Sequence, residues 1–206
     1  VTREKLRDLL LEKFDEDRED IAADQRLYVA LGILDQDADL FGLFLDLYGE
    51  GVLGFYDAEI ETFYMVLEEE DGFEPSDIRT YAHEFVHALQ QQHFDFHATF
   101  EALEDNSDGA LALRALLEGD ASLLERVYLF EHMTEAERDA SQSEPTSSLI
   151  RAFRAVPHVV QRFFLYPYQE GFLFALEVFR TGEWDAVDQA FEELPQSTEQ
   201  ILHPEK

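Results

Sequence analysis

The chain has 206 residues, 46% of them hydrophobic, which suits the core of a single domain, and its lack of cysteine excludes disulfides, thiol catalysis and cysteine-based zinc sites. Its 46 acidic residues outnumber its 15 lysines and arginines, and the resulting net charge of −31 disfavours nucleic acid and anionic lipid as partners. No run of about 18 apolar residues exists and no leader pattern follows Val1, so we expect no transmembrane segment, and the sequence assigns no compartment.

The N-terminal part carries three short helical patterns. Residues 3–14 place leucines and a phenylalanine on one helical face. Two more patterns cover residues 21–34 and 37–48, and the last of them opens with an aspartate cap. We expect these helices, within residues 1–48, to form a segment that could cover a cleft in the remaining part, residues 49–206.

The character of the sequence changes after the third pattern. Residues 51–71 are rich in aromatic and β-branched side chains with a polar middle, which predicts a β-hairpin turning near residues 57–61. Pro75, Ser76 and Asp77 form a helix start signal.

The rest of the chain is predicted to be helical. A polar break at residues 104–109 precedes a long helix at about 110–133, and residues 141–148 are the best linker candidate. Further helical patterns follow at residues 147–165, 168–181 and 184–194. Pro157 is expected to bend or divide the first of them. The sequence therefore predicts an α+β fold that is mostly helical and has one small sheet.

The helix that starts at Pro75 contains His83, Glu84 and His87 in the order H-E-x-x-H. Residues four apart on a helix differ by only about 40° in direction, so the two imidazoles point the same way and can share one metal ion. Glu84 lies about 100° round the helix, where its carboxylate can reach a coordinated water. The alternatives are a chance match and two surface histidines without a metal.

Zinc catalysis usually takes three protein ligands, and without cysteine the third must be His, Asp or Glu. Glu118 interrupts an apolar stretch of the following helix, and a buried carboxylate there needs a metal or a partner. Asp120 and Glu125 are the competing candidates. A second pair, His93 and His97, has the same spacing but lacks a carboxylate beside it, and we expect a structural or supporting role for it.

These motifs resemble the gluzincin branch of the HExxH zinc metallopeptidases. The segments "HEFVHALQQQHFDF", "LLEGDAS", "YPYQEG" and "STEQILHPEK" are similar to those of a little-characterised prokaryotic group in that clan. The resemblance implies a single zincin-like domain over residues 1–206 that binds Zn²⁺ and hydrolyses peptide or protein substrates. It implies His83, His87 and Glu118 as zinc ligands and Glu84 as the general base. The hairpin would supply the edge strand along which substrates lie.

The chain departs from that pattern in two places. The spacing from His87 to Glu118 is longer than in thermolysin-like enzymes. Four residues after Glu118, where many gluzincins have an aspartate that orients the first histidine, this chain has Ser122. The orienting partner must then come from elsewhere, and Asp120 and a backbone carbonyl are the candidates.

A donor for the developing oxyanion is also required. Tyr168 at a helix mouth is the candidate, Tyr166 is expected to be a core aromatic, and His203 is a further alternative. The competing interpretation of the whole chain is a zinc-binding but non-proteolytic, or latent, zincin-fold protein that acts as a partner-binding module.

Overall fold

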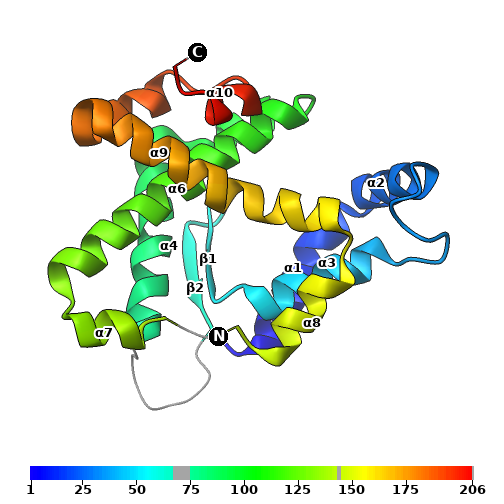
Figure 1. Cartoon of the computed structure of the whole chain (residues 1–206). Helices are drawn as coiled ribbons and strands as arrows, with labels where there is room; N and C mark the ends of the chain where they lie inside the picture. Colours follow the sequence, from blue (N-terminus) through cyan, green and yellow to red (C-terminus); the bar gives the residue numbers. More distant parts are fainter. Residues whose placement is uncertain (67–74, 143–144, 206) are drawn as a thin grey trace. The chain divides into compact units, whose positions relative to one another are not determined.

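The computed structural model describes residues 1–66, 75–142 and 145–205. These residues are mostly helical, at 75%, and include a small two-stranded antiparallel sheet, as the sequence predicts. The helices and strands are α1 Arg3–Glu16, α2 Arg18–Ala30, α3 Leu40–Gly51, β1 Gly54–Asp57, β2 Thr62–Met65, α4 Pro75–Phe94, α5 Phe96–Ala102, α6 Ser107–His132, α7 Glu135–Ala140, α8 Ser147–Ala155, α9 His158–Glu192 and α10 Thr198–Leu202 (Figure 1). Among the described residues, none of the helices combines the length and the apolar character needed to cross a membrane.

The chain divides into two compact units. In its described part, the first unit holds residues 1–53, 65–66 and 145–163. Within this unit, α1, α2 and α8 each pack on α3. Its core contains three completely buried leucines, which are Leu6, Leu40 and Leu47. Asp39 caps α3 by accepting a hydrogen bond from the backbone of Gly42, as the sequence predicts. A cover over the cleft by residues 1–48 stays a prediction.

The second unit holds residues 54–64 and, within the described ranges, 75–142 and 164–205. Its core lies between α6, α9 and α10 and contains Ala112, Leu113, Ala115, Leu116, Leu117, Phe174, Val187, Phe191 and Ile201. The predicted hairpin is present, although residues 67–71 of the predicted segment lie outside the described residues. So do residues 143–144 of the expected linker.

Strand β1 packs directly on helix α4, and Gly54 permits this close approach (Figure 1). A methyl group at position 54 would lie 2.8 Å from the Thr80 side chain and 3.1 Å from the Glu84 side chain. The hairpin therefore lies against the helix that carries the H-E-x-x-H motif.

The C-terminal helical patterns merge differently from the prediction. Pro157 separates α8 from α9, as expected, but α9 continues through Pro167 where the sequence suggested a break between residues 165 and 168. A proline removes one hydrogen bond but leaves the apolar face continuous, and here that face packs on the core. The expected break near residue 182 is present, with non-helical backbone at Gly182 and Glu183.

Helices α6 and α9 cross at a pair of glycines. A Cβ atom at Gly119 would overlap the carbonyl oxygen of Gly171, and one at Gly171 would overlap the carbonyl oxygen of Ala115. Only glycine allows the two backbones to come this close. The crossing fixes the position of Glu118 on one helix and of Tyr168, one turn before Gly171, on the other.

We expect Gly171→Ala to destabilise the protein. Alanine is the better helix former by about 1 kcal/mol, but its methyl group would meet a backbone carbonyl that cannot rotate away, and overpacking typically costs about 1–3 kcal/mol or more. Chemical unfolding measures the change. Gly49→Ala is the matched control, because a methyl group in that helical position meets only the far end of the Arg7 side chain, at 3.3 Å, and not a backbone carbonyl, so the change should cost much less stability.

Candidate metal centre

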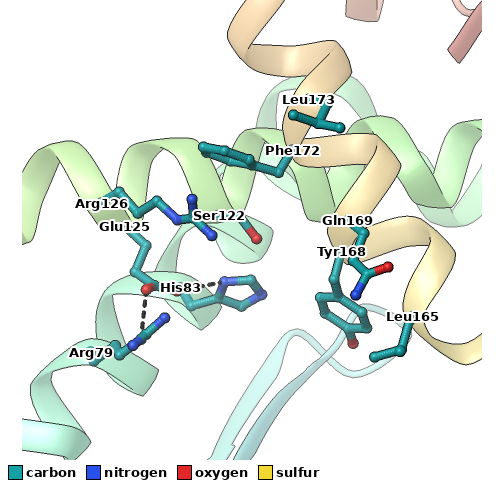
Figure 2. Close-up of a pocket in the computed structure, with 10 residues that line it drawn as sticks. All are labelled: Arg79, His83, Ser122, Glu125, Arg126, Leu165, Tyr168, Gln169, Phe172 and Leu173. Atoms are coloured by element: carbon teal, nitrogen blue, oxygen red, sulfur yellow. Dashed lines mark hydrogen bonds and ion pairs between the residues drawn. The ribbon is translucent and has the colours of Figure 1, made fainter. Parts of the chain in front are cut away.

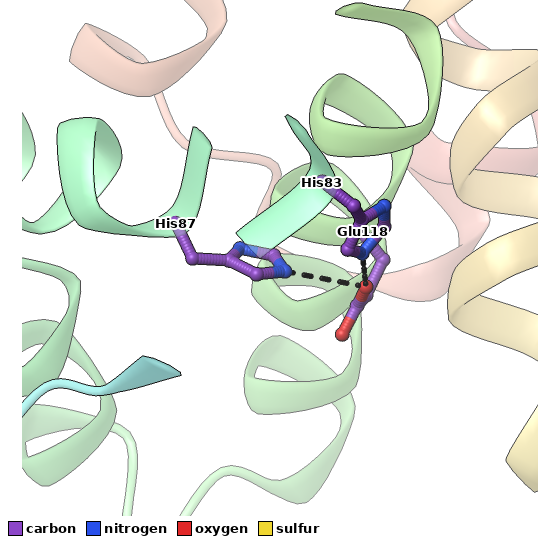
Figure 3. Close-up of side chains that lie close together, drawn as sticks. All are labelled: His83, His87 and Glu118. Atoms are coloured by element: carbon purple, nitrogen blue, oxygen red, sulfur yellow. Dashed lines mark hydrogen bonds and ion pairs between the residues drawn. The ribbon is translucent and has the colours of Figure 1, made fainter. Parts of the chain in front are cut away.

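Two imidazoles and one carboxylate converge between α4 and α6 (Figure 3). The Nε2 atom of His83 lies 3.1 Å from Oε2 of Glu118, and the Nε2 atom of His87 lies 3.5 Å from the same oxygen. All three side chains are largely buried, with 13–15% of their side-chain surface exposed. The three residues that the sequence singles out as zinc ligands are thus brought together.

The spacing of these atoms fits a bound metal ion. One ligand atom from each of His83, His87 and Glu118 lies within 4.8 Å of the other two. Two atoms held tetrahedrally at about 2.0–2.1 Å from zinc are about 3.3 Å apart, close to the observed 3.1 and 3.5 Å. The nitrogen and oxygen donors are of the type that zinc prefers. This group can therefore hold a metal ion.

The pairing of α4 with α6 shows why the group forms. Residues 83, 87 and 90 of α4 contact residues 125, 118 and 117 of α6 in that order, so the two helices run in opposite directions. An antiparallel pair brings successive turns of one helix opposite successive turns of the other. Ligands spaced by helical turns consequently meet across the interface.

A carboxylate orients His83, but it is not the expected one. Glu125 accepts a hydrogen bond at 3.2 Å from Nδ1 of His83, the ring nitrogen opposite the one that faces Glu118. Arg79 holds Glu125 through a 2.7 Å ion pair. Ser122 lies one helical turn before Glu125 and carries no charge, and Glu125 is the residue that orients His83. The expectation that Asp120 or a backbone carbonyl would orient His83 is therefore wrong.

His87 is oriented through an amide. Its Nδ1 atom lies 2.8 Å from Oε1 of Gln90, an amide oxygen that accepts the hydrogen bond from the ring N–H. The amide nitrogen of Gln90 donates to Asp120 at 2.8 Å and to the carbonyl of Leu117 at 3.1 Å. Asp120 therefore supports the second histidine, by way of Gln90. Hydrogen bonds to the Nδ1 atoms leave both Nε2 atoms directed at the candidate metal position.

The electrostatics couple these groups strongly. Burial alone would lower the pKa of His83, but its hydrogen bonds to Glu118 and Glu125 raise that pKa to about 10. Burial would raise the pKa of Glu118, yet the two histidines hold that pKa well below its ordinary value. Burial raises the pKa of Asp120 to about 6, against the lowering effect of the Gln90 amide.

Glu84 is buried beside the cluster, with 8% of its surface exposed. Burial raises the pKa of its carboxyl, while the charges of His87 and His83 and a backbone hydrogen bond from Tyr56 of β1 lower it, and the net change is upward. A carboxylate with a raised pKa is a better proton acceptor near neutral pH. Glu84 is thus a buried carboxylate that is close to both histidines and to the backbone of β1.

The three candidate oxyanion donors lie in different surroundings. Tyr168 lines a cavity together with His83 and faces that imidazole across it (Figure 2). Tyr166 instead packs on the core and donates a 3.1 Å hydrogen bond to the carbonyl of Thr198. His203 lies 3.7 Å from Glu205 and 4.0 Å from Glu199, outside the residues that line this cavity.

The second histidine pair does not share one helix. Helix α4 ends at Phe94, and Asp95 adopts a left-handed conformation that starts a new helix. His93 therefore lies on α4 and His97 on α5, where it faces Glu101 at 3.9 Å.

Sequence reasoning missed the roles of Gln90 and Glu125. Both follow a ligand at a helical interval: Gln90 is three residues after His87, and Glu125 is seven residues after Glu118. Polar residues that continue the ligand face of a helix are the signal that identifies them.

Comparisons of the chain with known protein families, with curated proteins and with solved structures gave no match. The chemistry proposed for the site therefore rests on its own residues.

Proposed function

We propose that the protein is a zinc-dependent peptide hydrolase with a gluzincin-type, zincin-like site. The observation that carries this proposal is the convergence of His83, His87 and Glu118 on one position, with Glu84 buried beside them. Two imidazoles and one carboxylate form the ligand set of thermolysin-type zinc enzymes, which leave the fourth position open.

Each side chain has a defined task in this proposal. Zinc, when bound, supplies a Lewis acid that lowers the pKa of a water from about 15.7 toward 7. Glu84 accepts a proton from the water as its oxygen attacks the peptide carbonyl, and then delivers that proton to the leaving amine as the C–N bond breaks. Glu125 and Gln90 hold the two imidazoles in the tautomer that presents Nε2 to the metal.

The hairpin is the proposed guide for the substrate. Strand β1 packs on α4 beside Glu84, and Tyr56 of this strand already hydrogen-bonds to the Glu84 carboxylate. An extended peptide that lies along the hairpin would pass the general base. Backbone pairing of this kind binds peptides with little dependence on their side chains.

Tyr168 is the proposed oxyanion donor, because it faces His83 across the cavity. We expect Tyr168→Phe to lower kcat by about 10²- to 10³-fold and to leave KM nearly unchanged, since such a donor acts in the transition state. Steady-state kinetics test this. Tyr166→Phe is the matched control: it loses a core hydrogen bond worth about 1 kcal/mol of stability but should keep the wild-type kcat.

The proposed function is tested by metal content and cleavage measured together. Protein purified without added metal should contain about one zinc per chain and cleave a mixture of unstructured peptides. Chelation should stop the cleavage, and zinc should restore it. Zinc without cleavage of any peptide would support the non-proteolytic alternative, and protein that binds no zinc would contradict both interpretations.

A further inference from the structure

The cavity beside His83 contains an arginine that the metal centre does not use (Figure 2). The cavity has a volume of about 620 Å³, and its lining residues come from α4, α6 and α9. They are Arg79, His83, Ser122, Glu125, Arg126, Leu165, Tyr168, Gln169, Phe172 and Leu173. A cavity of this size accommodates a substrate side chain or a peptide end.

The two arginines in the cavity differ in their partners. Arg79 forms a 2.7 Å ion pair with Glu125, which also hydrogen-bonds to His83. The guanidinium of Arg126 lies over the ring of Phe172, 3.7 Å from the ring centroid. Within the described residues, the structure gives Arg126 no carboxylate partner, so its charge is not neutralised in the cavity.

The sequence of α6 places no acidic residue one helical turn from Arg126. Residues three and four positions away on a helix are the ones that face each other, and for Arg126 these are Leu123, Leu129, Ser122 and Phe130. Glu125, the next residue in the chain, lines the same cavity, but its carboxylate is engaged by Arg79 and His83. The α9 residues that line the cavity carry no charge either. In a chain with 46 acidic and 15 basic residues, an unneutralised arginine beside the candidate centre is unusual.

The stacking on Phe172 prepares Arg126 to bind an anion. A guanidinium that lies over an aromatic face can still donate two parallel hydrogen bonds from its N–H groups to a carboxylate. The contact also restricts the side chain before any ligand binds, which lowers the entropic cost of binding. Ser122, one helical turn away in the same cavity, adds a hydroxyl.

We propose that this cavity is a substrate subsite in which Arg126 binds a carboxylate of the peptide, so that the enzyme prefers acidic substrates. This inference rests on the proposed peptide hydrolase function. The carboxylate could belong to an aspartate or glutamate side chain or to the C-terminus of the peptide, and both present the same chemistry to the guanidinium. At about 0.15 M salt the Debye length is about 8 Å, so the net charge of −31 does not prevent the contact.

Binding to the zinc-loaded Glu84→Gln protein tests the inference separately from catalysis. Labelled peptides that differ only by Glu or Gln, one position at a time, are titrated by fluorescence anisotropy. At one position we expect the Glu peptide to bind about 10- to 100-fold more tightly, the range of hydrogen bonds to charged groups. A pair with a free or an amidated C-terminus distinguishes a terminal carboxylate from a side-chain carboxylate.

The arginine variants are made in the same Glu84→Gln background. Arg126→Gln should abolish the preference, and Arg126→Lys should restore it only partly, because an ammonium lacks the planar fork. Arg114→Gln is the matched control: Arg114 lies on the same helix, 5.5 Å from the centroid of Phe100, but outside the cavity, and its loss should leave the preference unchanged.

The outcomes separate the two proposals. Equal or unmeasurable binding of every peptide pair, or an equal loss of preference in the Arg114 and Arg126 variants, would overturn the carboxylate subsite. A preference that depends on Arg126, in a protein whose zinc-loaded wild type cleaves no peptide, would support the subsite and contradict the hydrolase function.

Discussion

Replacement of Glu84 by glutamine should abolish peptide hydrolysis while zinc content and fold remain. The amide matches the carboxylate in shape and can still accept the backbone hydrogen bond from Tyr56, but it cannot take a proton from the attacking water. A general base contributes about 10²- to 10⁴-fold to the rate, and we expect kcat/KM to fall within or beyond that range. Hydrolysis of a fluorogenic peptide by zinc-loaded protein measures the loss.

Glu84→Gln should also affect the stability of the metal-free protein. Burial raises the pKa of Glu84 because the charged carboxylate is poorly solvated there, so a neutral amide of equal size removes an unfavourable charge. The free energy of unfolding of metal-free Glu84→Gln should therefore equal or exceed that of the wild type. A loss of activity together with a loss of stability or zinc would indicate a structural role instead. Glu101→Gln, at an exposed site on α5, serves as the control for any general effect of removing one negative charge.

Much of the fold follows from local sequence signals. The aspartate cap of α3, the start of α4 at Pro75 and the division of α8 from α9 at Pro157 each depend on a few neighbouring residues, and each was predicted. The passage of α9 through Pro167 was not, because packing against the core outweighs the hydrogen bond that a proline removes. Gly119 and Gly171 have no local signature either, since their role exists only where two distant helices cross.

The candidate ligands were predictable for a similar reason. His83 and His87 share a helical face by spacing alone, and Glu118 interrupts an apolar helix where a lone carboxylate would be unfavourable. The orienting residues were harder to identify, because several polar residues follow each ligand and only the antiparallel pairing of α4 with α6 selects Glu125 and Gln90. The contact of Arg126 with Phe172 likewise depends on α9, and the sequence does not predict where α9 packs.

The assignment of Glu118 as a ligand and Glu125 as an orienting residue predicts two different losses of zinc. Glu118→Ala removes one of three donors and leaves two buried imidazoles without their carboxylate, so zinc should be lost almost completely. Glu125→Ala removes only the acceptor for Nδ1 of His83, and orienting residues typically contribute about 10–100-fold to metal affinity. Elemental analysis and competition with a chromophoric chelator measure both losses.

A third variant separates orientation from charge. Glu125→Gln keeps an oxygen that can accept from Nδ1 of His83, so it should recover much of the affinity that Glu125→Ala loses, whereas Glu118→Gln should recover little because a neutral amide is a poor zinc ligand. The order of zinc affinity should then be wild type, Glu125→Gln, Glu125→Ala and, well below them, both Glu118 variants. The reverse order, with zinc retained by Glu118→Ala and lost from Glu125→Ala, would make Glu125 the third ligand, because the Nδ1 atom of His83 and not its Nε2 atom would then face the metal.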